Sequence, residues 1–169
     1  MAATDRTRTN ARPTRPHPAI ERWQREHRYG SRSYGGHGTL TPDGVDRVDT
    51  AALARDLSAA VGGEVRFGAG DRAIYSHDSS NYRQPPIGVV VPRDTNDVVA
   101  ATEVCRRHGA PIVSRGCATG LAGQTCNVAV VFDHSQHLRS ILEVDPEQGR
   151  ARIQPGVIRD QLAHRVEGP

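Results

Sequence analysis

A glycine-rich run between residues 114 and 127 contains the residue types and spacing in this sequence that could do chemistry. Gly116, Gly120 and Gly123 are spaced G-x-x-x-G-x-x-G, and small residues fill most of the gaps between them. Two linked phosphates are bound by several backbone N–H groups that converge on them, which requires that no large side chain lies in the way. The run therefore predicts a cradle for a diphosphate.

Several side chains of the run can assist such a cradle. Arg115 can neutralise phosphate charge, and Thr119, Gln124 and Asn127 can donate hydrogen bonds. The alternative is a plain turn, in which glycine serves only to reach positive φ. The length of the loop and its place after a strand that we expect to be buried both favour a ligand. The predicted contact residues in this run are Arg115, Gly116, Cys117, Ala118, Thr119, Gly120, Leu121, Ala122, Gly123, Gln124 and Asn127.

Composition and charge exclude other classes of phosphate-binding protein. The sequence has 22 basic residues and all of them are arginine, so the lysine that a P-loop uses to reach phosphates is missing. Residues 1–48 contain nine arginines against five acidic residues, a net charge of +4, whereas residues 49–169 contain thirteen against fourteen, a net charge of −1. The positive charge belongs to the tail and not to the folded part, which disfavours nucleic-acid binding.

The cysteines and the hydropathy pattern indicate a cytoplasmic protein. Cys105, Cys117 and Cys126 are an odd number and form no C-x-x-C pair, so we expect neither disulfides nor a zinc ribbon. No run approaches the roughly 20 apolar residues of a membrane span, and the N-terminus has no apolar signal segment. A His-Asp step at residues 77–78 has no third ligand in register, and we therefore assign no metal.

The elements that position the glycine run are typical of an α/β (α+β) domain. Gly88–Val91 and Pro111–Val113 read as strands that flank a helix, which begins after Asp94 or Thr95 and ends at Gly109. This β-α-β unit predicts two parallel strands. We expect the inner face of the helix to consist of Val98, Val99, Thr102, Val104 and Cys105.

Further elements are expected on either side of this unit. Ahead of it, a helix capped by Asp49 or Thr50 precedes a short strand at Glu64–Phe67 and a helical turn at Asp71–Ser76. After the glycine run we expect a strand at residues 128–132, an antiparallel hairpin of residues 141–144 and 151–154, and a helix at about 157–166.

The chain divides into three predicted regions. Residues 1–48 hold too few apolar side chains to offset their ordering entropy, so we expect a disordered basic tail, with a helical turn near residues 20–28 and an undecided role for Trp23. Residues 49–85 form an N-terminal helix and lead-in segment. Residues 86–169 form the domain that carries the glycine run.

The run Pro111–Gln124 resembles the pyrophosphate loop of PCMH-type (vanillyl-alcohol-oxidase-like) FAD-binding flavoproteins, in particular the branch that contains glycolate oxidase and D-lactate dehydrogenase. That branch has roughly R-G-G-G-T-S-L-A-G-Q. The departures are Cys117 and Ala118 in place of glycine and Gly120 in place of serine, and all three residues are small enough to keep phosphate access. The matching positions are Arg115, Gly116, Thr119, Leu121, Ala122, Gly123 and Gln124.

The resemblance implies a fold, a cofactor and a reaction class. The fold would be the first subdomain of a PCMH-type FAD-binding domain, a β-α-β unit followed by a mixed sheet and hairpin. The cofactor would be FAD, with its diphosphate on residues 115–124 and with Gly156 and Val157 close to the flavin or adenine half. The family oxidises small 2-hydroxy acids such as D-lactate or glycolate by hydride transfer to the flavin.

The resemblance also implies parts that this sequence does not supply. The second FAD subdomain and the substrate domain, with the catalytic base, would belong to a missing C-terminal half, so we assign no catalytic residue here. Whether the chain is itself an enzyme stays open. The alternatives are a catalytically incompetent fragment and a non-catalytic phosphate- or nucleotide-binding module.

Overall fold

A computed structural model describes residues 48–167 of the chain. The predicted disorder of the basic tail, the helical turn near residues 20–28 and the role of Trp23 concern residues outside this range.

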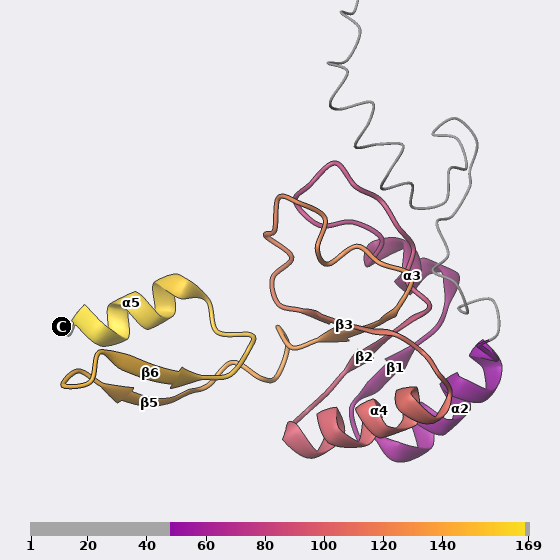
Figure 1. Cartoon of the computed structure of the whole chain (residues 1–169), viewed down its shortest axis with the longest axis horizontal. Helices are drawn as coiled ribbons and strands as arrows, with labels where there is room; N and C mark the ends of the chain where they lie inside the picture. Colours follow the sequence, from indigo (N-terminus) through magenta and orange to yellow (C-terminus); the bar gives the residue numbers. More distant parts are fainter. Residues whose placement is uncertain (1–47, 168–169) are drawn as a thin grey trace, which may run out of the picture. The chain divides into compact units, whose positions relative to one another are not determined.

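The described residues are organised around a four-stranded mixed sheet (Figure 1). Its strands are β1 (Glu64–Arg66), β2 (Gly88–Val91), β3 (Ile112–Arg115) and β4 (Val130–Asp133), and their order across the sheet is β1-β2-β4-β3. β4 is parallel to both of its neighbours, whereas β1 is antiparallel to β2. The predicted mixed sheet and the parallel direction of β2 and β3 are confirmed.

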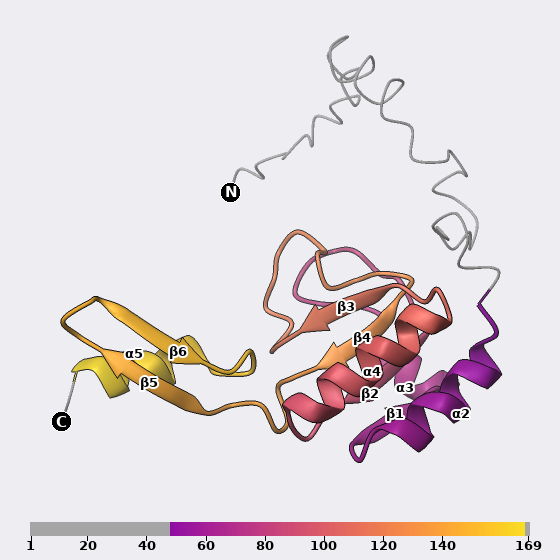
Figure 2. The ribbon, with the colours of Figure 1, turned by 60° about the horizontal axis from the view of Figure 1, so that its bottom comes forward.

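Two helices cover one face of this sheet, as Figure 2 shows. α2 (Thr50–Ala60) begins at Asp49, whose carboxylate accepts hydrogen bonds from the amides of Ala51 and Ala52 at 3.0 and 2.9 Å. α4 (Thr95–Arg107) begins at Asp94, whose carboxylate accepts from the amide of Asp97 at 3.0 Å. Side-chain acceptors at these positions satisfy amides that have no partner within the helix, which fixes where each helix starts.

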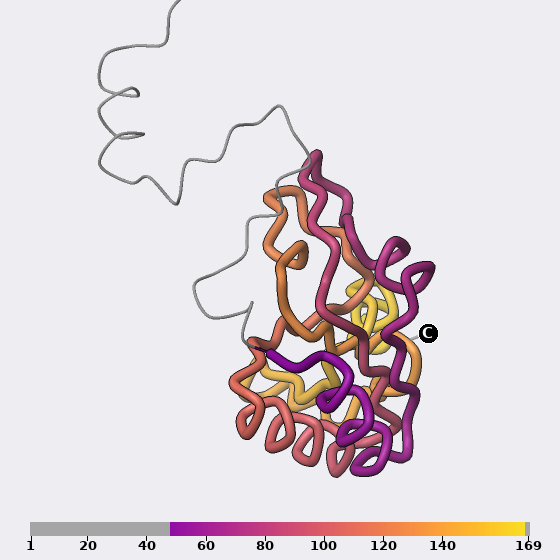
Figure 3. The backbone as a smooth tube through the Cα atoms, turned by 90° about the vertical axis from the view of Figure 1, so that its right-hand side faces the viewer, coloured from indigo at the N-terminus to yellow at the C-terminus, as the bar shows by residue number. Residues whose placement is uncertain are grey.

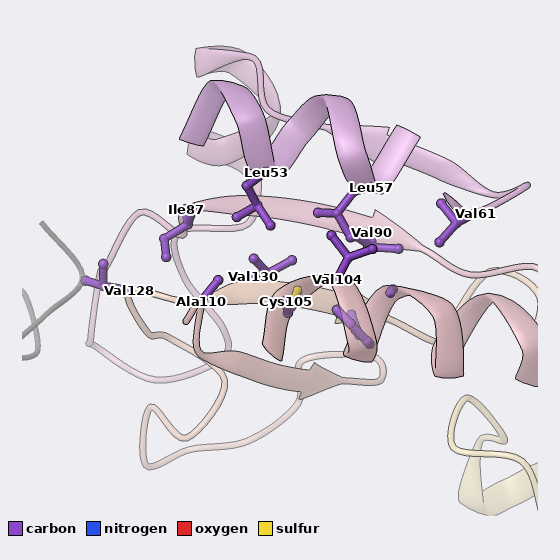
Figure 4. Packing of buried hydrophobic residues seen from close by; sticks show 12 residues of the cluster. Leu53, Leu57, Val61, Ile87, Val90, Val104, Cys105, Ala110, Val128 and Val130 are labelled. Carbon is purple, nitrogen blue, oxygen red and sulfur yellow. The ribbon is translucent and has the colours of Figure 1, made fainter. Parts of the chain in front are cut away.

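The main core lies between these helices and the sheet (Figure 4). Leu53 and Leu57 of α2 are fully buried, and so are Val90 of β2 and Val130 of β4. The spacing of four residues in the helix and the alternation in the strands bring these side chains to the same layer. The other members of the cluster are Val61, Ile87, Ala101, Val104, Cys105, Ala110, Val128 and Phe132.

The predicted inner face of α4 is partly wrong. Val104 and Cys105 are buried as expected, but Val99 is 64% exposed and Thr102 is exposed. Asp97 and Ala101 are buried in their place. Asp97 is tolerated there because its carboxylate accepts from the amides of Gly62 and Arg93 at 2.8 and 2.9 Å, which join the ends of α2 and β2 to α4.

The strand that leads into the glycine run is at the edge of the sheet, contrary to the expectation of a buried strand. β4 lies between β2 and β3, so β3 has a neighbour on one side only among the described strands. Ile112 is 39% exposed, whereas every residue of β2 and β4 is buried. The glycine run thus starts from an edge strand and returns to the centre of the sheet.

The opposite face of the sheet has a smaller apolar cluster. It consists of Val89, Val91, Val131 and Tyr75, with Val113 packed against them. Tyr75 follows the short helix α3 (Ala69–Ile74), which corresponds to the predicted turn at residues 71–76.

The last part of the described chain is a separate antiparallel pair of strands and a helix. β5 (Ile141–Asp145) and β6 (Arg150–Ile153) form the predicted hairpin, with Gly149 in its turn at φ +61°. α5 (Arg159–Glu167) follows, and none of its residues is buried. None of the helices in residues 48–167 is long and apolar enough to cross a membrane.

The packing of the core predicts that two leucine-to-alanine variants differ in their free energy of unfolding. Leu57→Ala should lower the free energy of unfolding by about 2–5 kcal/mol, because it leaves a cavity under α2. Leu142→Ala, at a residue that is 57% exposed, should change it by less than about 0.5 kcal/mol. Urea unfolding of both variants measures the difference, and equal costs would contradict this account of the core.

Candidate functional site

The glycine loop, residues 116–127, connects the end of β3 to the strand at the centre of the sheet. β3 ends at Arg115, whose carbonyl accepts a hydrogen bond from the amide of His134 just after β4, at 2.9 Å. The carboxyl ends of these parallel strands therefore lie together at one edge of the sheet, where ligands of α/β proteins collect.

The backbone amides of the glycine loop are available to a ligand. The amides of Gly116 through Leu121 donate no hydrogen bond to any acceptor within residues 48–167. The first loop amides that are bonded are Ala122, to the side-chain oxygen of Gln124 at 3.2 Å, and Cys126, to the carbonyl of Gly123 at 3.0 Å. Leu121, the one large apolar side chain of the loop, is 78% exposed and does not close it.

The conformation of the loop depends on two residues in the left-handed region. Ala118 has φ +55°, which is unusual for a residue with a side chain, and Gly123 has φ +73°. A Cβ atom at Gly123 would also lie 2.5 Å from the Tyr82 ring, so only glycine fits there. By contrast, a Cβ atom at Gly116 would meet only the carbonyl of Pro155, at 3.4 Å, so the backbone at Gly116 is open on one side.

A buried polar cluster supports the start of the loop. The Tyr75 hydroxyl donates to Asp133 at 2.6 Å, and the Asp133 carboxylate also accepts from the amide and hydroxyl of Ser135 at 2.8 and 2.6 Å. Arg115 donates to the Tyr75 carbonyl at 3.2 Å, and its guanidinium lies 5.1 Å from the centre of the Tyr75 ring. The cationic side chain thus lies half-buried at the base of the loop, where its contacts are with Tyr75.

A second loop lies beside the glycine loop, as the tube in Figure 3 shows. This lateral loop, residues 77–83, is closed at its neck by a bridge between His77 and Arg83. Its contacts with the glycine loop involve both ends of that loop: Ser79 bonds to Ala118, Asp78 to Thr125, and Tyr82 to Cys126.

Five further residues are predicted contacts of the cofactor, three in the glycine loop and two after β6. Thr119, Gln124 and Asn127 are exposed, and the Asn127 side-chain oxygen accepts from the amide of Val128 at 2.8 Å. A Cβ atom at Gly156 would lie 2.3 Å from the carbonyl of His134, so Gly156 packs on the chain just after β4. Val157, half-buried, bonds through its amide to the carbonyl of Gln154 at 3.1 Å.

The cysteines and histidines around the loop differ in their surroundings. All three cysteines are free thiols; Cys117 is exposed, Cys126 is half-buried and Cys105 is buried. Burial raises the pKa of the Cys105 thiol to about 11. His134 is buried and its Nδ1 atom has no partner among the described residues, and burial lowers its pKa, whereas His137 is exposed.

Sequence reasoning missed the lateral loop as part of this site. Residues 77–83 lie in the predicted lead-in segment, residues 49–85, to which the sequence assigned no function. An aspartate in a polar stretch is normally exposed to solvent, but Asp78 is buried and accepts a hydrogen bond from Thr125. Asp133 accepts hydrogen bonds from the amide and the hydroxyl of Ser135, so it caps the turn that follows β4.

Comparison with known proteins identifies a family for the C-terminal half of the chain. Residues 86–168 match the model of the FAD binding domain family. The glycolate oxidase subunit GlcD of Bacillus subtilis is 37% identical over 101 residues, which cover 57% of this chain. The D-2-hydroxyglutarate dehydrogenase of Escherichia coli is 39% identical over 103 residues, which cover 59% of this chain. The matches span only 21% and 10% of the length of these relatives.

Solved structures show the same fold. The crystal structure of p-cresol methylhydroxylase with substrate bound superposes with a TM-score of 0.60 at 18% identity, over 75% of this chain and 25% of that one. The expected α/β fold of a PCMH-type FAD domain is thereby confirmed. The segment from residue 86 to residue 168 thus matches the FAD binding domain family, and this match supports FAD as the cofactor.

The residues of this chain fit such a cofactor. A diphosphate requires adjacent unpaired amides, a close backbone approach and freedom from bulky side chains. The amides of Gly116–Leu121 and the open side of Gly116 meet these requirements.

Because the buried Tyr75 hydroxyl donates to Asp133, we predict that it loses its proton only at high pH. Burial, and then the hydrogen bond to Asp133, raise the pKa of Tyr75 from 10.0 to about 12. The protonated form is favoured in the folded state, so this contribution to stability is complete below pH 10 and is lost as pH rises towards 12. Tyr75→Phe should remove this late tyrosinate absorbance step and, since Asp133 loses a donor, lower the free energy of unfolding by about 1–3 kcal/mol.

Tyr82→Phe is the control for this titration, because Tyr82 is 55% exposed. Absorbance titration and urea unfolding of both variants make the comparison. A late step that persists in Tyr75→Phe would contradict the assignment.

Proposed function

We propose that this chain is the N-terminal, cofactor-binding part of an FAD-dependent oxidoreductase that oxidises a small 2-hydroxy acid such as D-lactate or glycolate. In this proposal the loop of residues 115–124 holds the FAD diphosphate. The observation that carries it is the row of unbonded amides from Gly116 to Leu121 at the carboxyl edge of a parallel pair of strands.

The substrate class rests on the relatives. A glycolate oxidase component and a D-2-hydroxyglutarate dehydrogenase are named for two acids that both have a hydroxyl on the carbon next to a carboxylate. The chain spans a small share of either protein, so the proposal assigns the substrate ligands and the catalytic base to further parts of the flavoprotein. A reducing compartment such as the cytoplasm belongs to the proposal because the three cysteines are free thiols.

Each part of the site has a separate task in binding. When bound, FAD supplies the acceptor for the hydride that leaves the hydroxyl-bearing carbon of the substrate. The amides of the glycine loop bind the diphosphate, and the small side chains of Cys117 and Ala118 leave room for it to approach. Arg115 adds positive charge at the base of the loop while it fixes the loop to Tyr75. Gly156 and Val157 belong to a second segment of the chain, which lies near Gly116 because the carbonyl of Pro155 faces that residue.

Ligand-dependent melting distinguishes this function from its alternatives. FAD at fifty times its Kd should raise the free energy of unfolding by about 2 kcal/mol. ADP at the same concentration should raise it by less than FAD does. A shift with ADP that FAD does not exceed would instead indicate a nucleotide-binding module without flavin chemistry. No shift with either ligand would contradict the proposal.

A charge placed on the loop tests where the diphosphate binds. Thr119 is exposed, so Thr119→Asp should leave the melting temperature of the free chain unchanged. It should weaken FAD and ADP binding about tenfold, because a carboxylate close to the phosphates repels them.

Thr119→Asn is the matched neutral control and should bind as the parent chain does. Fluorescence titration with FAD, repeated at high salt, provides the measurement, since the difference should shrink as salt screens the charges. Equal affinities for the two variants at low salt would place the diphosphate elsewhere.

A further inference from the structure

The lateral loop, residues 77–83, contacts the glycine loop at three points. The Ser79 amide and hydroxyl both donate to the carbonyl of Ala118, at 3.0 and 3.2 Å. The Thr125 hydroxyl donates to Asp78 at 3.0 Å. The Cys126 thiol lies 3.7 Å from the carbonyl of Tyr82, with the Tyr82 ring against Gly123.

The contact at Ala118 determines the direction of an amide. A trans peptide unit is planar, and its carbonyl and its N–H point in opposite directions. Because the Ala118 carbonyl is turned to Ser79, the amide of Thr119, which belongs to the same peptide unit, points away from the lateral loop. The left-handed φ of Ala118 is unfavourable for alanine, so these bonds hold a peptide that would otherwise relax.

The contact at Asp78 fixes the other end of the glycine loop. Asp78 is only 9% exposed, and besides Thr125 its carboxylate accepts from the amide of Ser80 at 2.9 Å. Hydrogen bonding from Ser80 and then from Thr125 holds the pKa of Asp78 well below its usual range. A charged carboxylate with a hydrogen bond to each of its oxygens therefore joins the two loops at any pH near neutrality.

We infer that the lateral loop positions the diphosphate cradle: Ser79 and Asp78 hold the glycine loop so that its free amides point away from the lateral loop and towards the phosphates. This rests on the proposed function, because the ligand is the diphosphate of FAD. The two residues act through Ala118 and Thr125 and are positioning residues. Removal of one contact loosens the loop and lowers affinity for every ligand that carries the diphosphate.

Thr125→Val tests this inference with little change in side-chain volume, because it removes the hydroxyl that bonds to Asp78. Thr125→Ser restores the hydroxyl. Thr102→Val is the matched control, since the Thr102 hydroxyl bonds only to the carbonyl of Val98 within α4. All variants are made in a Cys117→Ser chain, so that Cys126, which is half-buried between the two loops, becomes the reporter thiol beside the buried Cys105.

Two measurements are made at a temperature well below unfolding. Thr125→Val should raise the rate at which Cys126 reacts with an aromatic disulfide reagent about tenfold, and it should weaken FAD and ADP binding by similar factors of about ten. Thr125→Ser should restore both values, and Thr102→Val should change neither. Thr125→Val should melt at a somewhat lower temperature, because the buried carboxylate of Asp78 loses a donor, but every variant should be fully folded at the temperature of these measurements.

The outcomes separate this inference from the proposed function. If Thr125→Val binds FAD as the parent does, the inference is wrong even if Cys126 reacts faster, because the contact is then only structural. If the parent chain binds FAD and Thr125→Val changes neither affinity nor thiol rate, the inference is also wrong. If the parent binds neither FAD nor ADP, the proposed function fails, and the inference fails with it.

Discussion

The site depends on the orientation of a few peptide units at the end of an edge strand. A peptide that turns its carbonyl towards the protein must turn its N–H away from it, so a neighbour that donates to the carbonyls of a loop also directs the amides. In this chain Ser79 donates to Ala118, and the amides from Gly116 to Leu121 have no acceptor within residues 48–167. Small residues such as Gly116 and Ala118 leave the backbone of the loop open to the close approach that the proposed diphosphate would require.

The rest of the fold supports that arrangement. Two capped helices pack on the buried valines of β2 and β4, and β4 brings Asp133 to the point where Arg115 ends β3. Tyr75 joins these two residues from the opposite face of the sheet, through its hydroxyl and its carbonyl. The loop is therefore fixed at its start by a buried polar cluster and at its end by Asp78, while its middle stays exposed.

Much of the fold could be predicted because its signals are local. Asp49 and Asp94 cap helices, Gly109 has the left-handed φ that ends α4, and Gly149 has it in the hairpin turn. The edge position of β3 could not be predicted, because the order of strands depends on how β4 inserts between β2 and β3. The exposure of Val99 and the burial of Asp97 also depend on packing, here on the end of α2 at Gly62. The partnership of Asp78 with Thr125 joins residues 47 positions apart, which no local pattern indicates.

Amide NMR of the nitrogen-15-labelled chain tests most directly whether the glycine loop binds the FAD diphosphate. We predict that FAD shifts the amide signals of Gly116 through Leu121, that ADP shifts the same signals, and that riboflavin, which has no phosphate, leaves them in place. These amides should also exchange with solvent more slowly when FAD is bound, because each gains an acceptor. Binding of FAD without any change at residues 116–121 would contradict the assignment of the diphosphate to this loop.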